Sequence, residues 1–168
     1  MAIPTAATLH HTGFLVRDLE AAARRLSDAR GIGPWNVWTI APTYCMVRGK
    51  PSPFTFRAAL ATVGTGTFEL IAPHTGRSVY DDYLEEHGEG FHHTCLMYPT
   101  LDAVREAKAE ARRQGLEIIQ EGSADDVFDF AYVVFPEIAS LVELLYLDPS
   151  KLPPPEAVIG LASSPSAV

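Results

Sequence analysis

The sequence predicts an α+β fold built from two copies of one module. The segment Leu9-His10-His11-Thr12 near the N-terminus reappears 82 residues later as Phe91-His92-His93-Thr94. The match continues in register, because Leu19-Glu20-Ala21 corresponds to Leu101-Asp102-Ala103. An internal repeat is the sequence signature of a duplicated structural unit.

A second repeated motif closes each half. Phe68-Glu69-Leu70-Ile71 ends the first half and Val142-Glu143-Leu144-Leu145 ends the second. The His-to-Glu separation is 58 residues in the first half, from 11 to 69, and 50 in the second, from 93 to 143. We therefore expect a longer loop in the first half. A strand, a helix and about three strands in each half favour a mixed α+β unit over a doubly wound sheet.

The first module is predicted over residues 1–87. Alternating residues indicate a strand over 8–16, with His11, Gly13 and Leu15 on one face. Asp18 is a suitable N-cap for the helix that follows, which should end near Gly31 or Gly33. Two strands over 54–63 and 67–72 flank a turn at 64–66. The aromatic, proline-broken stretch from 35 to 53 is predicted to be irregular and to hold the extra residues.

The second module is predicted over residues 88–150, after a short helix capped by Ser78. It begins with a strand over 91–98 and a helix from Thr100 to about Gly115. Strands over 116–121, 128–135 and 139–147 follow. Pro, Ser and Ala dominate thereafter, so residues 151–168 are predicted to be a flexible tail.

Composition narrows the range of partners. The chain has 168 residues and a formal charge of −8, which argues against nucleic acid and offers no basic patch for a membrane surface. A small-molecule partner is therefore favoured. Cys45 and Cys95 lack CxxC spacing and predict neither a disulfide framework nor a thiolate zinc site. With no signal-peptide pattern and no apolar run long enough for a membrane span, we expect a cytoplasmic protein.

Four residues at equivalent strand positions are candidate metal ligands: His11, Glu69, His93 and Glu143. If the modules pair about a local two-fold axis, the four side chains converge. Two imidazoles and two carboxylates suit a divalent ion such as Zn, Co, Ni, Mn or Fe. Two further positions on an octahedral ion would accept two adjacent substrate oxygens and stabilise an enolate. Taken singly, each His or Glu is more commonly a structural residue; the repeat is what favours a metal.

At these motifs the chain resembles the vicinal oxygen chelate superfamily, which contains glyoxalases, bleomycin-resistance proteins and extradiol dioxygenases. His-Thr-Gly-Phe-Leu-Val at 11–16 and Gly-Glu-Gly-Phe-His-His at 88–93 carry the resemblance together with the two Glu motifs. Within the superfamily, it is most similar to methylmalonyl-CoA epimerases and glyoxalase-like proteins. The resemblance implies two βαβββ modules forming a cupped mixed sheet, with the four candidates as metal ligands. It also implies that His10 and His92 face the helix side. A homodimer is a further expectation.

Glu69 favours isomerase, epimerase or lyase chemistry, because dioxygenases of this superfamily use a set of two His and one Glu. A ligand carboxylate, Glu143 or Glu69, would act as the base that moves a proton next to a carbonyl. One departure weakens the likeness to an epimerase, since residues 40–60 contain no Asp or Glu to serve as a second base. A metal-free binding protein of the bleomycin-resistance type and a non-haem iron dioxygenase are the alternatives.

Five residues in the first half are candidates for substrate binding. Arg48 and Arg57 could meet a carboxylate or phosphate, although solvated surface charge is the commoner role of such residues. The aromatic side chains of Trp35, Trp38 and Tyr44 could wall a pocket, with core packing as an equal alternative.

Overall fold

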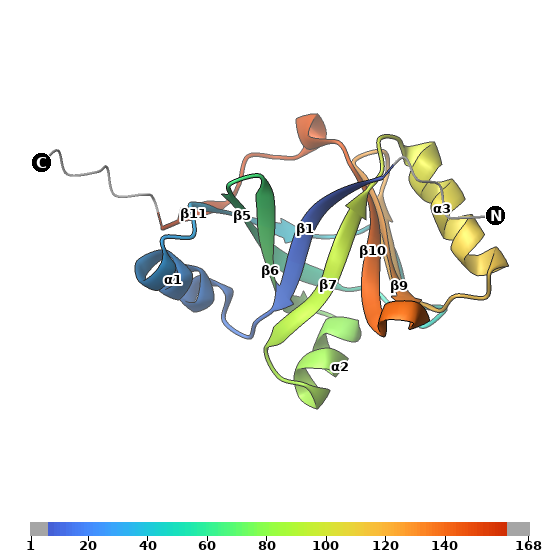
Figure 1. Ribbon diagram of the computed structural model, residues 1–168, viewed down its shortest axis with the longest axis horizontal. Coiled ribbons are helices and arrows are strands. Elements are labelled where there is room, and N and C mark those ends of the chain that lie inside the picture. Colours follow the sequence, from blue (N-terminus) through green and yellow to red (C-terminus); the bar gives the residue numbers. More distant parts are fainter. Residues whose placement is uncertain (1–6, 161–168) are drawn as a thin grey trace, which may run out of the picture.

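The computed structural model describes residues 7–160, which form one mixed sheet with three α-helices packed against it (Figure 1). The strand order is β11-β2-β5-β6-β1-β7-β10-β9-β8-β3-β4. The helices are α1 (Leu19–Arg30), α2 (Val79–Glu86) and α3 (Leu101–Arg113), with short 3₁₀ turns at Pro136–Ile138 and Pro149–Lys151. The strands are β1 (Thr8–Leu15), β2 (Trp35–Ile40), β3 (Tyr44–Val47), β4 (Lys50–Pro51), β5 (Thr55–Val63), β6 (Gly66–Thr75), β7 (Gly90–Met97), β8 (Ile118–Ala124), β9 (Phe128–Phe135), β10 (Ser140–Leu147) and β11 (Ala157–Ile159).

The two halves of the chain lie side by side in this sheet. β2-β5-β6-β1 belongs to the first half and β8-β9-β10-β7 to the second, and the halves meet where β1 pairs antiparallel with β7. β1 is parallel to β6, just as β7 is parallel to β10. The α+β class and the duplicated strand-helix-strand plan are therefore confirmed.

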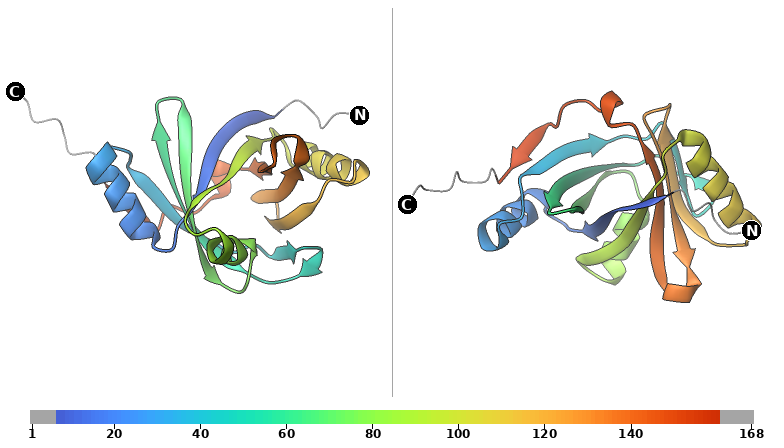
Figure 2. Two further views of the ribbon diagram at one scale, coloured as in Figure 1. Left: turned by 60° about the horizontal axis from the view of Figure 1, so that its bottom comes forward. Right: turned by 45° about the horizontal axis from the view of Figure 1, so that its top comes forward.

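Helices α1 and α3 cover the outer face of the sheet, one on each half (Figures 1 and 2). Asp18 accepts a hydrogen bond from the backbone N–H of Ala21, and Thr100 accepts one from Ala103, so both predicted N-caps are present. The helices bury Leu19 and Val104 against their own halves. These two helices leave uncovered the inner face of the sheet, which is the face that carries the His11 side chain.

Helix α2 packs on the inner face, at one end of the junction between the halves (Figure 1). Ser78 and Asp81 form a capping box at its start, as the predicted cap at Ser78 requires. Tyr80 is fully buried, and its hydroxyl lies 2.9 Å from that of Tyr132 on β9. This helix connects the two modules and has no counterpart in the repeat, so it makes the two ends of the inner face different.

The stretch from 35 to 53 is not irregular, contrary to the prediction. It contains β2, which pairs with β5, and the short strands β3 and β4. β3 leaves its own half and pairs with β8 of the second half, with Cys45 opposite Gly122. Period-2 patterns are hard to detect in strands of four residues or fewer between prolines, and the partner of β3 lies far along the chain.

Residues 151–160 are not a flexible tail. The chain crosses from the end of β10 to the opposite edge of the sheet, where β11 pairs antiparallel with β2 (Figure 2). Residues 148–156, between β10 and β11, are called the crossing segment. Two side-chain contacts hold it against β2: the indole N–H of Trp38 donates to the carbonyl of Pro153 at 2.9 Å, and Thr39 binds the carboxylate of Glu156. Residues 161–168, the rest of the predicted tail, lie outside the described residues.

Candidate metal centre

The four predicted ligands come together on the four central strands. His11 lies on β1, Glu69 on β6, His93 on β7 and Glu143 on β10. The Nε2 atom of His11 is 3.1 Å from Nε2 of His93 and 3.1 Å from Oε2 of each carboxylate. The Nε2 atom of His93 is 3.5 Å from Oε2 of Glu69 and 3.4 Å from Oε2 of Glu143. Residues far apart in sequence thus direct four ligand atoms at one point.

Strand register explains this convergence. Gly13 of β1 lies opposite both Glu69 and His93, while Leu141 of β10 lies opposite His93. The absence of a side chain at Gly13 makes room for the His93 imidazole, since a Cβ atom at this position would lie only 2.0 Å from Cε1 of His93. Gly13 is a site residue that the sequence reading did not identify, although its position two residues after His11 places it on the same face.

The electrostatics of the cluster favour a bound cation. Burial raises the pKa of Glu69, but the combined influence of His11 and His93 outweighs this effect and lowers the pKa to about 2. Burial also raises the pKa of Glu143, but the nearby imidazoles of His11 and His93 together hold it well below its ordinary value. Burial lowers the pKa of His11, yet Glu69 and Glu143 together raise it well above its usual range.

The donor set fits a divalent metal. Oε2 of Glu69 and Oε2 of Glu143 are buried without a hydrogen-bond partner, and an unpaired buried carboxylate oxygen is costly. A cation between two imidazole nitrogens and two carboxylate oxygens would satisfy both, and nitrogen and oxygen ligands suit the borderline and hard divalent ions. His11, His93 and Glu143 already bring one ligand atom each within 4.8 Å of one another, and Glu69 approaches both histidines.

His10, the first histidine of the N-terminal pair, lies beside His11 because of a β-bulge. Leu9 pairs with Leu96 and Thr12 with Thr94, so His10 and His11 together lie opposite Cys95. Nδ1 of His10 is therefore 2.8 Å from Nδ1 of His11, on the inner face of the sheet. The expectation that His10 faces the helix side is wrong, because the bulge interrupts the alternation on which it depended.

His92 repeats this arrangement at the other end of the site. Its Nδ1 is 3.0 Å from Nδ1 of His93, and its ring packs against Tyr80 and Tyr83 of α2 and against Tyr132. It does meet a helix, but that helix is α2 on the inner face. Metal-binding histidines commonly donate their second ring N–H to a fixed partner, and His10 and His92 are placed to accept such bonds.

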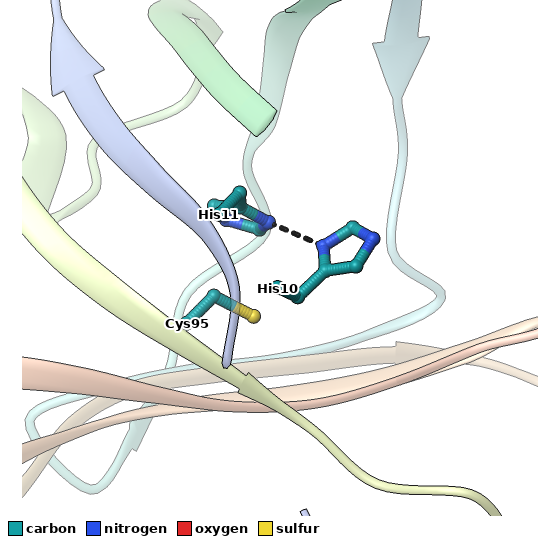
Figure 3. A group of neighbouring side chains, drawn as sticks. All are labelled: His10, His11 and Cys95. Carbon is teal, nitrogen blue, oxygen red and sulfur yellow. Dashed lines mark hydrogen bonds between the residues drawn. The ribbon is translucent and has the colours of Figure 1, made fainter. Parts of the chain in front are cut away.

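Cys95 completes a second cluster with His10 and His11 (Figure 3). One ligand atom of each lies within 4.8 Å of the others. Burial raises the pKa of the Cys95 thiol well above its usual range, and the charge of Glu143 raises it further. Both effects disfavour the thiolate form of Cys95.

A cavity of about 550 Å³ opens above the four ligands. His10, His11, Glu69 and Glu143 form its polar base, and the walls are apolar side chains and the crossing segment. The apolar lining comprises Trp38, Ile40, Phe56, Ala58, Leu60, Phe128, Leu145, Leu147, Pro149, Leu152, Pro153, Pro154 and Pro155. The volume is in the range of small-molecule sites.

Of the five predicted substrate-binding residues, only Trp38 lines this cavity. Trp35 is fully buried in the core beneath α1. Arg57 points to the outer face, where its guanidinium binds Glu20 of α1. Since Phe56 and Ala58 line the cavity, strict alternation along β5 places Arg57 on the opposite side.

Tyr44 and Arg48 also lie away from the cavity. Tyr44 is 47% exposed on β3, at the outer part of the sheet. Arg48 lines a separate hollow of about 360 Å³ beside α2, near Asp82 and Glu117. The sequence reading missed His10 and the prolines of the crossing segment, whose only signal was the run of three prolines at 153–155.

Comparison with known proteins agrees with this architecture. Methylmalonyl-CoA epimerase from Mycobacterium tuberculosis has 22% sequence identity and a TM-score of 0.59, with 89% of this chain and 95% of that chain covered. A hypothetical protein from Bacillus halodurans has 16% identity and a TM-score of 0.61, with coverages of 86% and 96%. A variant of the Streptomyces coelicolor epimerase, in complex with 2-nitronate-propionyl-CoA, has 19% identity and a TM-score of 0.58, with coverages of 85% and 99%. At such identities the likeness shows the fold.

No curated protein sequence shows significant similarity to the chain. Within residues 7–160, no helix has the length and hydrophobicity needed to cross a membrane. The family model described as Glyoxalase/Bleomycin resistance protein/Dioxygenase superfamily matches residues 10–135, which is most of the chain and spans both His motifs. The chain therefore belongs to the glyoxalase/bleomycin resistance protein/dioxygenase superfamily.

Proposed function

We propose that this protein is a metal-dependent isomerase, epimerase or glyoxalase-like lyase that shifts a proton next to the carbonyl of a small substrate. One observation carries the proposal: two buried carboxylate oxygens without partners and two imidazole nitrogens converge at the base of an apolar cavity. His11, Glu69, His93 and Glu143 would hold the ion. A divalent ion in this place would act as a Lewis acid toward substrate oxygens.

The side chains of the cavity supply the rest of the chemistry. Both carboxylates retain their negative charge, because the histidines lower the pKa of Glu69 and of Glu143. Each has one oxygen at the cavity base, where it can accept a proton from a substrate carbon about 3 Å away. A substrate that fills the space between the apolar walls would displace water, which strengthens these electrostatic interactions. His11 and His93 are held by His10 and His92, so their ring orientations are fixed before substrate arrives.

Glu143 is our choice for the base. It lies on β10, which continues directly into the crossing segment over the cavity, whereas Glu69 lies on β6. Glu143→Gln should retain metal, because an amide oxygen can still ligate. It should lose proton exchange at the substrate carbon by about 100-fold or more, the typical contribution of a general base.

The experiment compares Glu143→Gln with its counterpart Glu69→Gln. The wild-type protein is loaded with Zn, Co, Ni, Mn or Fe and its metal content is measured. It is then screened against acyl-CoA thioesters, hemithioacetals of 2-oxoaldehydes and catechols in heavy water. Loss of deuterium wash-in for Glu143→Gln alone supports the assignment. Wild-type exchange in that variant would show that Glu143 is only a ligand.

Two further measurements separate the rival functions. A purified protein that takes up none of these metals would be a binding protein rather than a metalloenzyme. Oxygen consumption with a catechol by the iron-loaded protein would indicate a dioxygenase. Neither outcome is compatible with the proton-transfer function proposed above.

A further inference from the structure

We propose that the cavity above the metal centre accepts an uncharged, largely apolar substrate whose only strongly polar part is a pair of adjacent oxygens at the cavity base. This inference rests on the proposed function, because the base would present the chelating ion. It specifies the substrate class, since it excludes ligands that carry a phosphate, sulfonate or second carboxylate into the cavity.

The lining carries this inference. Polar groups are confined to the base, at His10, His11, Glu69 and Glu143. The walls are aliphatic and aromatic, and among residues 7–160 no Lys or Arg lines the cavity. A phosphate or carboxylate is normally recognised by Arg, Lys or several backbone N–H groups. An anionic substituent in this cavity would find no such partner.

The nearest cations along the chain are engaged elsewhere. The guanidinium of Arg57 is bound to Glu20 on the outer face of the sheet. Lys151 belongs to the crossing segment, but its ammonium binds Asp126 and lies 3.5 Å from Asp148. Neither side chain is free to follow a ligand into the cavity without breaking an ion pair.

The backbone of the crossing segment offers no anion site either. Pro153, Pro154 and Pro155 form part of the wall, and proline has no backbone N–H to donate. The Trp38 indole N–H, a possible side-chain donor of the wall, is already bound to the carbonyl of Pro153. This portion of the wall can therefore contact a ligand only through apolar surface.

The net charge of the metal-loaded cavity base also gives no attraction for an anionic ligand. Two carboxylates and one divalent ion sum to zero, so the loaded centre does not attract an additional distant anion. Burial of an unpaired charge among apolar walls is strongly unfavourable, whereas burial of an apolar ring there is favourable. The structure thus selects for hydrophobic ligands by contact and against anionic ligands by desolvation.

The test uses two probes that differ by one charge: 2,3-dihydroxynaphthalene and its 6-sulfonate. Both present adjacent oxygens on the same bicyclic ring. Their affinities are measured by calorimetry and naphthalene fluorescence with zinc-loaded protein, and each is divided by the affinity of the same probe for free zinc. We expect the neutral diol to bind at least about 100-fold more tightly on this scale, because nothing compensates the buried sulfonate. Equal affinities would overturn the inference.

A matched pair of lysine variants tests the cause. Leu152→Lys places a cation on the cavity wall and should improve binding of the sulfonate by about 10-fold, as expected for one new ion pair in a partly buried site. Val158→Lys places the same charge on β11, the strand that follows this segment, at a residue that is 44% exposed and outside the lining. It should leave both affinities unchanged. An equal effect of the two variants would mean that general surface charge, and not the wall, sets the preference.

Failure of the proposed function remains distinguishable from failure of this inference. Both probes are also titrated against metal-free protein. If the protein takes up no zinc but still prefers the neutral diol, the metal-dependent function is refuted and the substrate class stands. If zinc binds and the two probes bind equally, the metal centre stands and the substrate class is refuted.

Discussion

Replacing Gly13 by Ala should displace His93 from the candidate metal centre. The added Cβ would lie 2.0 Å from Cε1, 2.5 Å from Nδ1 and 2.6 Å from Nε2 of the imidazole. To reach the 3.4 Å of an ordinary contact, the ring must move by about 1.4 Å. A metal–nitrogen bond tolerates only about 0.2 Å. We therefore expect Gly13→Ala to bind zinc at least about 100-fold more weakly, somewhat beyond the usual effect of an outer-shell change.

Competition with a chromophoric chelator gives the zinc affinity, and urea unfolding gives the stability. The overpacked variant should lose about 1–3 kcal/mol of folding free energy in the metal-free state. Gly66→Ala is the control, because its Cβ would be 3.7 Å from the nearest atom, the carbonyl oxygen of Val63. It should retain wild-type zinc affinity.

A double-mutant cycle identifies the cause of the loss. In the His93→Ala background the ring is gone, so the Gly13→Ala substitution should cost about 1–3 kcal/mol less stability than it does in the wild-type background. Wild-type zinc affinity in Gly13→Ala, or equal costs in the two backgrounds, would refute the steric argument.

Three further predictions concern the outer core, the crossing segment and pH. Lys108→Met should lower the free energy of unfolding by about 1–3 kcal/mol in urea titrations, because the buried ammonium lies 2.7 Å from Asp129 and 3.0 Å from Glu121, which among residues 7–160 would then keep only Arg105 and Arg112 as ion-pair partners; an unchanged midpoint would contradict this. Trp38→Phe removes the bond to Pro153, so hydrogen exchange in the crossing segment should become faster and stability should fall by about 1 kcal/mol; unchanged exchange would show that the bond does not fasten the segment. The carboxylates raise the pKa of both ligand histidines, so protons compete with metal below those raised values. Zinc affinity, and the rise in melting temperature that zinc causes, should therefore increase from about pH 6 to pH 8, and a flat profile would show that neither histidine is a ligand.

Much of the fold could be predicted from the sequence, because the repeat shows the same order of strands and helix in both halves. The strands that carry His11 and His93 and the helices capped by Asp18 and Thr100 have clear local patterns, and they appear where predicted. β3 was missed because it has only four residues, and most of its pairing is with β8, a contact that no local pattern encodes. Low hydrophobicity likewise hid the crossing segment, whose order depends on hydrogen bonds to β2.

The candidate site was predictable to the extent that it depends on alternation. His11 and Glu69 occupy strand positions whose facing could be read from period 2, and both lie at the cavity base. His10 could not be placed in this way, because a bulge is a pairing defect between two strands and leaves no trace in either one alone. Arg57 could have been excluded, since it alternates with the apolar residues of β5.

The pairing of β3 with the opposite half restricts how the two halves can move relative to each other. β3 belongs to the first half by sequence and is hydrogen-bonded to β8 of the second, while β11, which follows the second half in sequence, pairs with β2 of the first. A hinge at the β1/β7 junction would have to break these ladders together with its own. Local opening should therefore be concentrated in the segment between Pro149 and Pro155, which has no strand pairing. The rate of ligand exchange should then depend on the opening of that segment and not on a separation of the two halves.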